Sequence, residues 1–253
     1  MITDTIEKLV AKATQLVHLF NYCELCEQPI YQQVALCDHC VSLIPRFQLD
    51  SLSGDLLNRP EIYGLYSKCA FDHLIAISPY QYPMSDWLKQ FKYLGRWQYQ
   101  RLCCRVLSFH LNELLKLSDF RPPDIVMPVP IHINRWQHRG FNQTLPLART
   151  VAKVFKVQCN AGCLVRQTQT GSQAQASGQL RRKQLKNNFA LLTDETSNET
   201  SNEVTGKRVK LEGMHVALVD DVVTTGATVS EISRLLKAAN VAKVSVYCLA
   251  LSL

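Results

Sequence analysis

The stretch VALVDDVVTTGAT occupies residues 216–228. Its first four residues are apolar, which is typical of a buried strand in a parallel sheet. The strand runs directly into Asp220 and Asp221, and a loop of small and hydroxylated residues follows. Two adjacent carboxylates repel each other and resist burial, so they indicate a place where hydrogen-bond donors or a cation meet them. Open α/β sheets bind ligands at the carboxyl ends of their strands, which is where both aspartates are predicted to lie.

The loop that follows the aspartates is suited to an anion. Small residues allow the backbone to approach a ligand closely, and successive N–H groups can form an anion-binding nest. A helix is predicted from about residue 228 to residue 239, and its positive N-terminal end adds to the attraction. A ribose with hydroxyls near the aspartates and a 5-phosphate in the loop would satisfy both halves. The alternative is an ordinary strand–helix corner with a threonine cap and two solvated aspartates. The predicted phosphate-binding residues are Thr224, Thr225, Gly226, Ala227 and Thr228.

The segments around this stretch predict an α/β domain. A short apolar strand, DIVMPVP, is predicted at 124–130 and is stopped by prolines, and a helix follows at 142–155. One or two helices are predicted within 85–117, and the chain ends on an apolar strand, KVSVYCLALSL. Helices that alternate with apolar strands indicate a mainly parallel sheet flanked by helices.

Four cysteines near the N-terminus have the spacing of a zinc site. Two Cys-x2-Cys pairs are separated by ten residues, and each pair can form one knuckle of a tetrahedral four-thiolate shell. Such a closed shell leaves no position for water, so the zinc is predicted to be structural, and a short segment with little core needs it. The alternative is a redox dithiol. The predicted ligands are Cys23, Cys26, Cys37 and Cys40.

Composition and patterning suggest a two-part intracellular protein. Residues 1–60 are predicted to form an amphipathic helix, a cysteine module and a polar connector at 50–60, while 61–253 form the α/β domain. A disordered excursion is predicted at about 193–206, where no apolar face exists. No run approaches 18 apolar residues and no export signal is recognised, so we expect no membrane span and a cytoplasmic location. The net charge of +7 fits phosphorylated ligands or nucleic acid, or a surface that only maintains solubility.

The stretch at 216–228 resembles the phosphoribosyl-pyrophosphate (PRPP) signature of type I phosphoribosyltransferases. The resemblance implies that Asp220 and Asp221 hold the ribose 2- and 3-hydroxyls at the catalytic centre. It also implies that the loop at 224–228 holds the 5-phosphate and that magnesium accompanies the pyrophosphate.

A second stretch, MPVPIHINRWQHRGFNQTLPLA at 127–148, resembles the ComF/GntX family, which is associated with competence and DNA uptake. Arg135 and Arg139 would lie on a loop after a strand, where guanidinium groups can bind phosphate oxygens in a fork. The alternative is that both are solvated loop charges. The family also has an N-terminal zinc ribbon, which agrees with the cysteine spacing.

Two further segments are similar to the same family. LVRQTQTGSQ contains Arg166, Thr170 and Gln173, although the residues that usually follow in the family are replaced here. LKQFKYLGR, at 88–96, places Lys92 and Arg96 where they could face phosphates, and a solvated helix face explains both residues equally well.

These observations lead to two hypotheses of function. The first is a phosphoribosyltransferase-like protein that binds PRPP or a related ribose phosphate with magnesium and serves DNA uptake or nucleotide salvage; the sequence identifies no acceptor and leaves turnover open. The alternative is a nucleic-acid-binding competence factor that uses the same pocket for sensing or as a phosphate grip. Single-stranded DNA and a protein bound by the zinc ribbon are the further candidate partners.

Overall fold

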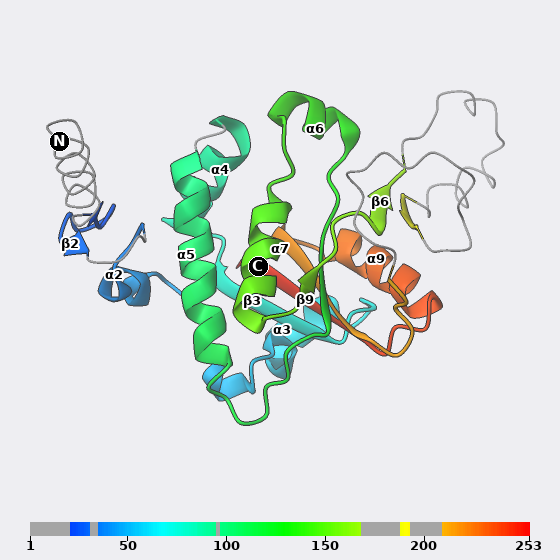
Figure 1. The fold of residues 1–253 in the computed structure, drawn as a ribbon. Helices are drawn as coiled ribbons and strands as arrows, with labels where there is room; N and C mark the ends of the chain where they lie inside the picture. The colour runs from blue at the N-terminus through cyan, green and yellow to red at the C-terminus, as the bar shows by residue number, and fades with distance from the viewer. Residues whose placement is uncertain (1–20, 31–34, 95–96, 168–187, 193–208) are drawn as a thin grey trace, which may run out of the picture.

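A computed structural model describes residues 21–30, 35–94, 97–167, 188–192 and 209–253 of the chain (Figure 1). Its centre is a five-stranded sheet in which every neighbouring pair is parallel. The strand order is β3-β9-β8-β4-β5, so β8, which contains both aspartates, is the central strand. The sheet strands are β3 (His73–Pro79), β4 (Ile125–Pro128), β5 (Gln158–Cys159), β8 (His215–Val223) and β9 (Lys243–Leu251).

Apolar runs form the middle of this sheet, as the sequence predicts. In β9, every residue from Val244 to Leu251 is buried, as expected for a strand covered on both faces. The strand β8 is longer than predicted, because its pairing with β9 continues through Asp220–Cys248 to Val223–Leu251. The aspartates therefore lie within the second half of the strand, where adjacent side chains point to opposite faces of the sheet.

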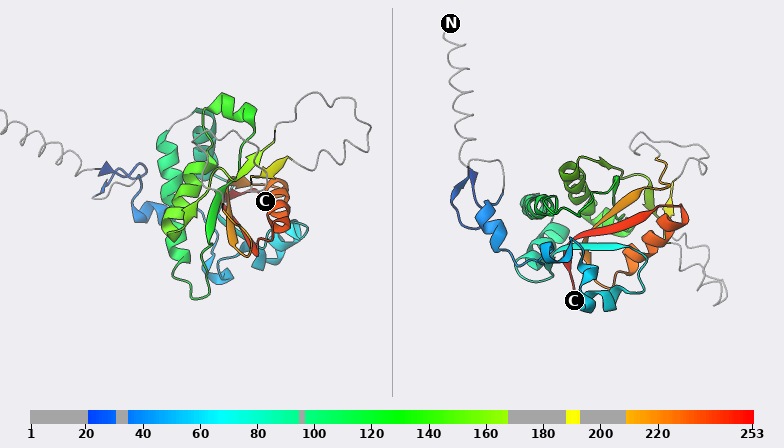
Figure 2. Two further views of the ribbon diagram at one scale, coloured as in Figure 1. Left: turned by 45° about the vertical axis from the view of Figure 1, so that its right-hand side comes forward. Right: turned by 90° about the horizontal axis from the view of Figure 1, so that it is seen from below.

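Helices cover both faces of the sheet (Figure 2). One face carries α4 (Met84–Leu94), α5 (Trp97–Leu114) and α7 (Thr144–Phe155), and the other carries α3 (Pro60–Tyr66) and α9 (Ala227–Ala238). The helices α7 and α9 match the helices predicted at 142–155 and 228–239. None of the helices that the structure describes combines the length and apolar character needed to cross a membrane.

Two smaller units flank the carboxyl edge of the sheet. The helix α6 (Ile133–Arg139) projects above α7 (Figure 1), and the strands β6 (Leu164–Arg166) and β7 (Phe189–Leu191) form an antiparallel pair. The pair is fixed to α9, because Glu231 Oε1 accepts a hydrogen bond of 2.8 Å from the backbone N–H of Asn188. The segment between the two strands, with Thr170, Gln173 and the basic run at 181–186, lies outside the described residues.

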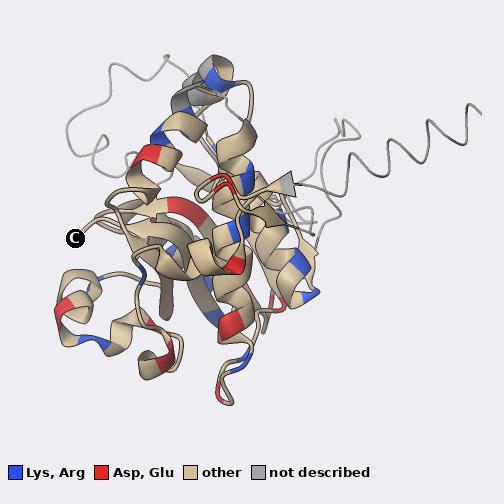
Figure 3. Ribbon diagram, turned by 90° about the vertical axis from the view of Figure 1, so that its left-hand side faces the viewer, with Lys and Arg blue, Asp and Glu red and all other residues tan. Residues whose placement is uncertain are grey.

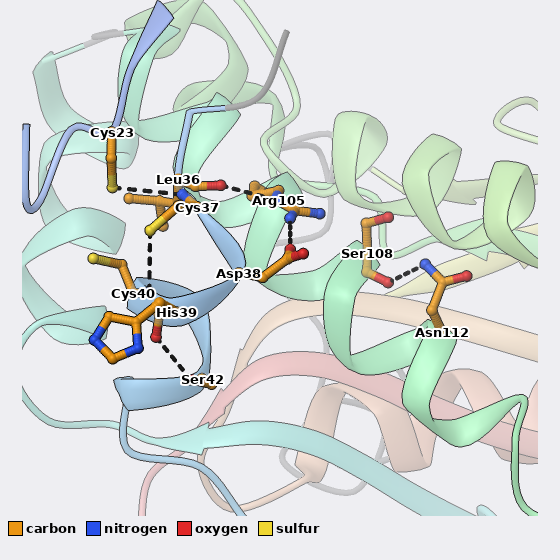
Figure 4. A network of polar contacts seen from close by, with 10 residues as sticks. All are labelled: Cys23, Leu36, Cys37, Asp38, His39, Cys40, Ser42, Arg105, Ser108 and Asn112. Atoms are coloured by element: carbon orange, nitrogen blue, oxygen red, sulfur yellow. Dashed lines mark hydrogen bonds and ion pairs between the residues drawn. The ribbon is translucent and has the colours of Figure 1, made fainter. Parts of the chain in front are cut away.

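The cysteine module is attached to the long helix α5. It consists of β1 (Asn21–Tyr22), β2 (Pro29–Ile30) and α2 (Asp38–Leu43). Figure 4 shows the attachment: Arg105 donates from Nε to the carbonyl of Leu36 at 3.2 Å and forms an ion pair with Asp38. The predicted N-terminal helix at 1–20 lies outside the described residues, as does the excursion predicted at 193–206.

The segment predicted as a polar connector is a structured part of the fold. It contains two 3₁₀ helices, η1 (Asp50–Leu52) and η2 (Leu56–Asn58), and Leu56 is fully buried. Asp55 is also buried, and its Oδ1 accepts hydrogen bonds from the backbone N–H groups of Leu57 and Leu74. The prediction considered only the polarity of the segment and missed that its two polar ends enclose an apolar turn.

Basic and acidic residues are interspersed on the side of the molecule that Figure 3 shows. Blue and red segments both occur over the helices and loops around the sheet. The net charge of +7 is therefore not gathered into one broad basic face on this side. Sequence charge alone does not identify a nucleic-acid surface here, and the candidate site has to be argued from local geometry.

Candidate functional site

A cavity of about 770 Å³ opens at the carboxyl ends of β8, β4 and β9. The predicted residues Asp220, Asp221, Thr224, Thr228 and Arg139 all line it. Segments far apart in the sequence supply the remaining walls, which include Tyr80, Lys92, Gln143, Thr144, Arg166 and Ser252. The geometry differs from a closed strand–helix corner, because both carboxylates border an open volume.

The two aspartates have different surroundings. Asp220 is half-buried, and its Oδ1 accepts a hydrogen bond of 2.8 Å from the backbone N–H of Asp221. Asp221 is only 4% exposed, and its Oδ1 lies 2.9 Å from the Nζ of Lys92 on α4. The alternative of two solvated aspartates therefore does not describe this corner of the molecule.

The loop after β8 encloses a smaller hollow of about 50 Å³. Asp220 and residues 222–229 line it, and α9 begins at Ala227 directly behind it. The first N–H groups of a helix have no acceptor within the helix, so they are available to an anion. The side chains of Thr224, Thr225 and Thr228 are exposed. Threonine hydroxyls and the N–H groups at the start of α9 thus surround the hollow together with one carboxylate.

Gly226 is required by the shape of this loop. Its φ of 71° lies in the left-handed region, which other residues adopt with strain. A Cβ at this position would lie 2.9 Å from Cδ1 and 3.0 Å from Cε1 of Tyr66, and 3.1 Å from the Sγ of Cys69. Both the backbone conformation and the close packing therefore exclude a side chain.

Tyr66 is a site residue that sequence reasoning missed. It is 3% exposed at the end of α3, and its hydroxyl donates a hydrogen bond to the carbonyl of Thr224. Burial raises the pKa of Tyr66 to about 12, so it remains a protonated donor at neutral pH. The segment after α3 adds a second contact, because the N–H of Ala70 donates to Ser230 Oγ at 3.0 Å. The tyrosine lies 158 residues before Thr224, and no local pattern marks it.

The basic residues near the cavity come from three separate elements. Arg139 on α6 and Arg166 on β6 both line it, and the guanidinium of Arg166 lies 5.2 Å from the ring centroid of Phe189. Lys92 completes this set from α4. The backbone of Arg135 belongs to α6, but its side chain is outside the described part of the structure, as is Arg96.

Hydrogen bonds fix the loop that follows β4 to the start of α7. The carbonyl of Val129 accepts from Thr144 Oγ1 at 2.8 Å and from Asn142 Nδ2 at 3.2 Å. Asn142 Oδ1 also accepts from the N–H of Thr144 at 3.1 Å. These contacts hold Thr144 and its neighbour Gln143 at the cavity wall, so part of the Arg-Gly-Phe-Asn-Gln stretch positions the backbone.

The four predicted zinc ligands come together in the cysteine module. Their sulfur atoms all lie within 4.8 Å of one another, and this is the one group among the described residues that could hold a metal ion. The Cys26 and Cys37 sulfur atoms are 3.8 Å apart. A tetrahedral shell with zinc–sulfur bonds of about 2.3 Å requires a separation of about 3.8 Å. The donor set therefore fits zinc in both chemistry and spacing.

The thiols of this cluster have opposed protonation tendencies. Burial tends to raise the pKa of Cys23, but hydrogen bonds from the backbone N–H groups of Cys37, Cys26 and Leu25 outweigh it and lower the pKa to about 6. Burial and the neighbouring thiols raise the pKa of Cys40. Four adjacent thiols cannot all lose their protons without a cation beside them. The arrangement therefore favours a bound metal over a redox pair.

The comparisons with known proteins give a consistent result. A family model described as "Phosphoribosyl transferase domain" matches residues 144–252. The chain is similar to the DNA utilization protein YhgH of Salmonella typhimurium, with 29% identity over 91% of this chain and 90% of that protein. It is also similar to Competence protein F of Haemophilus influenzae, with 28% identity over 90% of this chain and 89% of that protein.

Solved structures that resemble the chain include two phosphoribosyl enzymes. The first is the glutamine PRPP amidotransferase from B. subtilis complexed with ADP and GMP, with 18% identity, 63% of this chain and 30% of that chain covered, and a TM-score of 0.40. The second is the purine phosphoribosyltransferase from Pyrococcus horikoshii, with 14% identity and a TM-score of 0.33. The match covers 59% of this chain and 70% of that chain.

Proposed function

We propose that the protein binds PRPP together with magnesium, because a model described as a phosphoribosyl transferase domain matches residues 144–252 and the chain is similar to Competence protein F and DNA utilization protein YhgH. The observation that carries the proposal is the hollow formed by Asp220 and residues 222–229, which opens beside the larger cavity. A 5-phosphate fits the amides of the loop, and the sugar then lies beside the acidic pair. Arg139 and Arg166, which line the larger cavity, bind the remaining phosphates.

The same residues could assist transfer of the ribosyl group. As the bond between the anomeric carbon and the pyrophosphate oxygen loosens, positive charge develops on the sugar and negative charge on the pyrophosphate. Asp220 and Asp221 favour the first charge, and Arg139 and Arg166 favour the second. Magnesium, when bound, would neutralise pyrophosphate oxygens. The carboxylates and phosphate oxygens form the hard, oxygen-only donor set that this ion prefers.

Titration with PRPP and magnesium tests this function. The intact protein is expected to bind PRPP, and the Asp220→Asn/Asp221→Asn variant is expected to bind roughly 100-fold more weakly, because hydrogen bonds to charged groups contribute about 1.5–3 kcal/mol each. Asp119→Asn, which changes an exposed carboxylate outside the cavity, serves as the matched control and should bind normally. Equal affinity in the double variant and the intact protein would remove the acidic pair from the site.

The names of the homologues give the proposed context. We infer that this ribose-phosphate site serves DNA uptake or utilization, since both groups of relatives carry names from that process. A second candidate is binding of single-stranded DNA without turnover. It is favoured by α6, where Trp136 is 50% exposed and Ile133 is 41% exposed beside the cavity residue Arg139. Bases stack on exposed aromatic rings, and such binding would weaken steeply with salt and with Trp136→Ala.

A further inference from the structure

The side chains of the two adjacent aspartates of the site point to opposite faces of the sheet. Asp220 lines the small phosphate hollow together with residues 222–229, whereas Asp221 does not. Asp221 instead meets Lys92, which comes from α4 in the helix layer on the opposite face. Side chains of neighbouring strand residues alternate between faces, so the two carboxylates leave β8 in opposite directions, although both border the large cavity.

The Lys92–Asp221 pair is a largely buried ion pair. The side chain of Lys92 is 18% exposed and that of Asp221 is 5% exposed, and their charged atoms are 2.9 Å apart. Among the described residues, Asp221 Oδ2 is buried and has no hydrogen-bond partner. Lys92 is therefore the group that compensates the charge of Asp221. Removing a carboxylate from water costs more than one such contact usually returns, so stability alone does not explain why the pair is present.

The remaining donors of Lys92 are available to a ligand. An ammonium group has three N–H donors, and Asp221 Oδ1 accepts only one of them. Lys92 lines the large cavity, as do Arg139 and Thr144. Lys92 does not line the phosphate hollow, so the anionic group nearest Lys92 is not the one held by the loop. If the ligand is a ribose that carries phosphate groups at two positions, the group nearest Lys92 is the one on the anomeric carbon.

We propose, on the basis of the function given above, that the acidic pair is divided between two tasks. Asp220 binds the hydroxyls of the sugar. Asp221 is a positioning residue that holds Lys92, and Lys92 binds the pyrophosphate end of the ligand. This assignment differs from one in which both acids hold ribose hydroxyls, and it adds a cation from α4 to the binding set.

Titration with three separate ligands tests this division at a fixed magnesium concentration. The ligands are ribose 5-phosphate, inorganic pyrophosphate and PRPP. Lys92→Met is expected to weaken binding of pyrophosphate and of PRPP by roughly 10- to 100-fold, the range for one hydrogen bond to a charged group, and to leave ribose 5-phosphate within about twofold. Asp221→Asn should give the same pattern, while Asp220→Asn should weaken ribose 5-phosphate and spare pyrophosphate.

Coupling between the two substitutions gives the sharpest readout. Because Asp221 acts through Lys92, the variant Lys92→Met/Asp221→Asn should bind PRPP no more weakly than Lys92→Met alone. Lys92→Arg, which keeps the charge, should recover part of the affinity for pyrophosphate. Thermal unfolding is recorded for every variant, and the double variant, which contains no unpaired buried charge, should unfold at a higher temperature than Lys92→Met.

The outcomes separate this proposal from the function on which it rests. Multiplicative losses in the double variant, or a loss of ribose 5-phosphate binding in Asp221→Asn as large as in Asp220→Asn, would overturn the division of tasks while PRPP binding stands. An intact protein that binds none of the three ligands would overturn both proposals together.

Discussion

Replacing Cys23 and Cys26 together by serine is expected to remove zinc from the protein completely. The two residues supply half of the four-sulfur cluster, and two thiolates cannot complete a closed tetrahedral shell. In small zinc modules the metal contributes most of the folding free energy, about 10–16 kcal/mol in isolated zinc-finger peptides. The module therefore should not keep its fold when the metal is lost.

Metal analysis and limited proteolysis measure this effect. The intact protein should contain one zinc ion per four-cysteine cluster and should resist cleavage within 35–44, whereas the variant should contain none and be cut there. The variant Cys104→Ser/Cys159→Ser changes two half-buried cysteines outside the cluster and should retain zinc. Full zinc content in Cys23→Ser/Cys26→Ser would refute the four-thiolate assignment.

Loss of the module should also release its contact with α5. Leu36 directly precedes the second knuckle and Asp38 is the first residue of α2, and Arg105 contacts both. None of the residues that line the cavity comes from the cysteine module. We therefore expect the variant to bind PRPP through its α/β domain even after the zinc is lost.

Gly226→Ala is expected to abolish binding of ribose 5-phosphate, with a loss of roughly 100-fold or more. A left-handed backbone costs a residue with a side chain about 1–2 kcal/mol. The added methyl group also meets the Tyr66 ring at 2.9 Å, which is closer than carbon atoms approach each other. The loop must shift to relieve both, and its amides then no longer converge on one phosphate. Titration calorimetry measures the loss, and pyrophosphate binding should be nearly unchanged.

Gly213→Ala is the matched control for this prediction. Gly213 has a φ of 74°, close to that of Gly226, but a Cβ there would have no neighbour within 4 Å. The two variants share the backbone strain, but only Gly226 lies in the phosphate loop and against Tyr66. Similar affinities for ribose 5-phosphate in both variants would contradict the view that the loop at Gly226 binds the phosphate.

The sequence predicted the central elements of the site because its signals are local. Apolar runs and the small residues at 224–228 placed a strand, a loop and a helix in succession, and the structure confirms β8, the loop and α9. The end of β8 was missed, because the backbone ladder with β9 continues to Val223 although Asp220 and Asp221 are charged. Cysteine spacing likewise predicted the cluster that the structure brings together.

Contacts between distant segments could not be predicted in the same way. The Lys92–Asp221 pair joins a helix of one face to the central strand, and LKQFKYLGR indicated only that Lys92 could face phosphates. Nothing near Tyr66 in the sequence indicates a partner at Thr224. Such contacts depend on how the helix layers pack on the sheet. No local pattern in a single sequence indicates which distant segments this packing brings together.

A crystal structure of the intact protein with ribose 5-phosphate tests the central claim most directly. We expect the phosphate in the hollow lined by residues 222–229, within hydrogen-bond distance of the amides at the start of α9, and a sugar hydroxyl that donates to Asp220. A ligand bound elsewhere on the protein, with this hollow left empty, would contradict it.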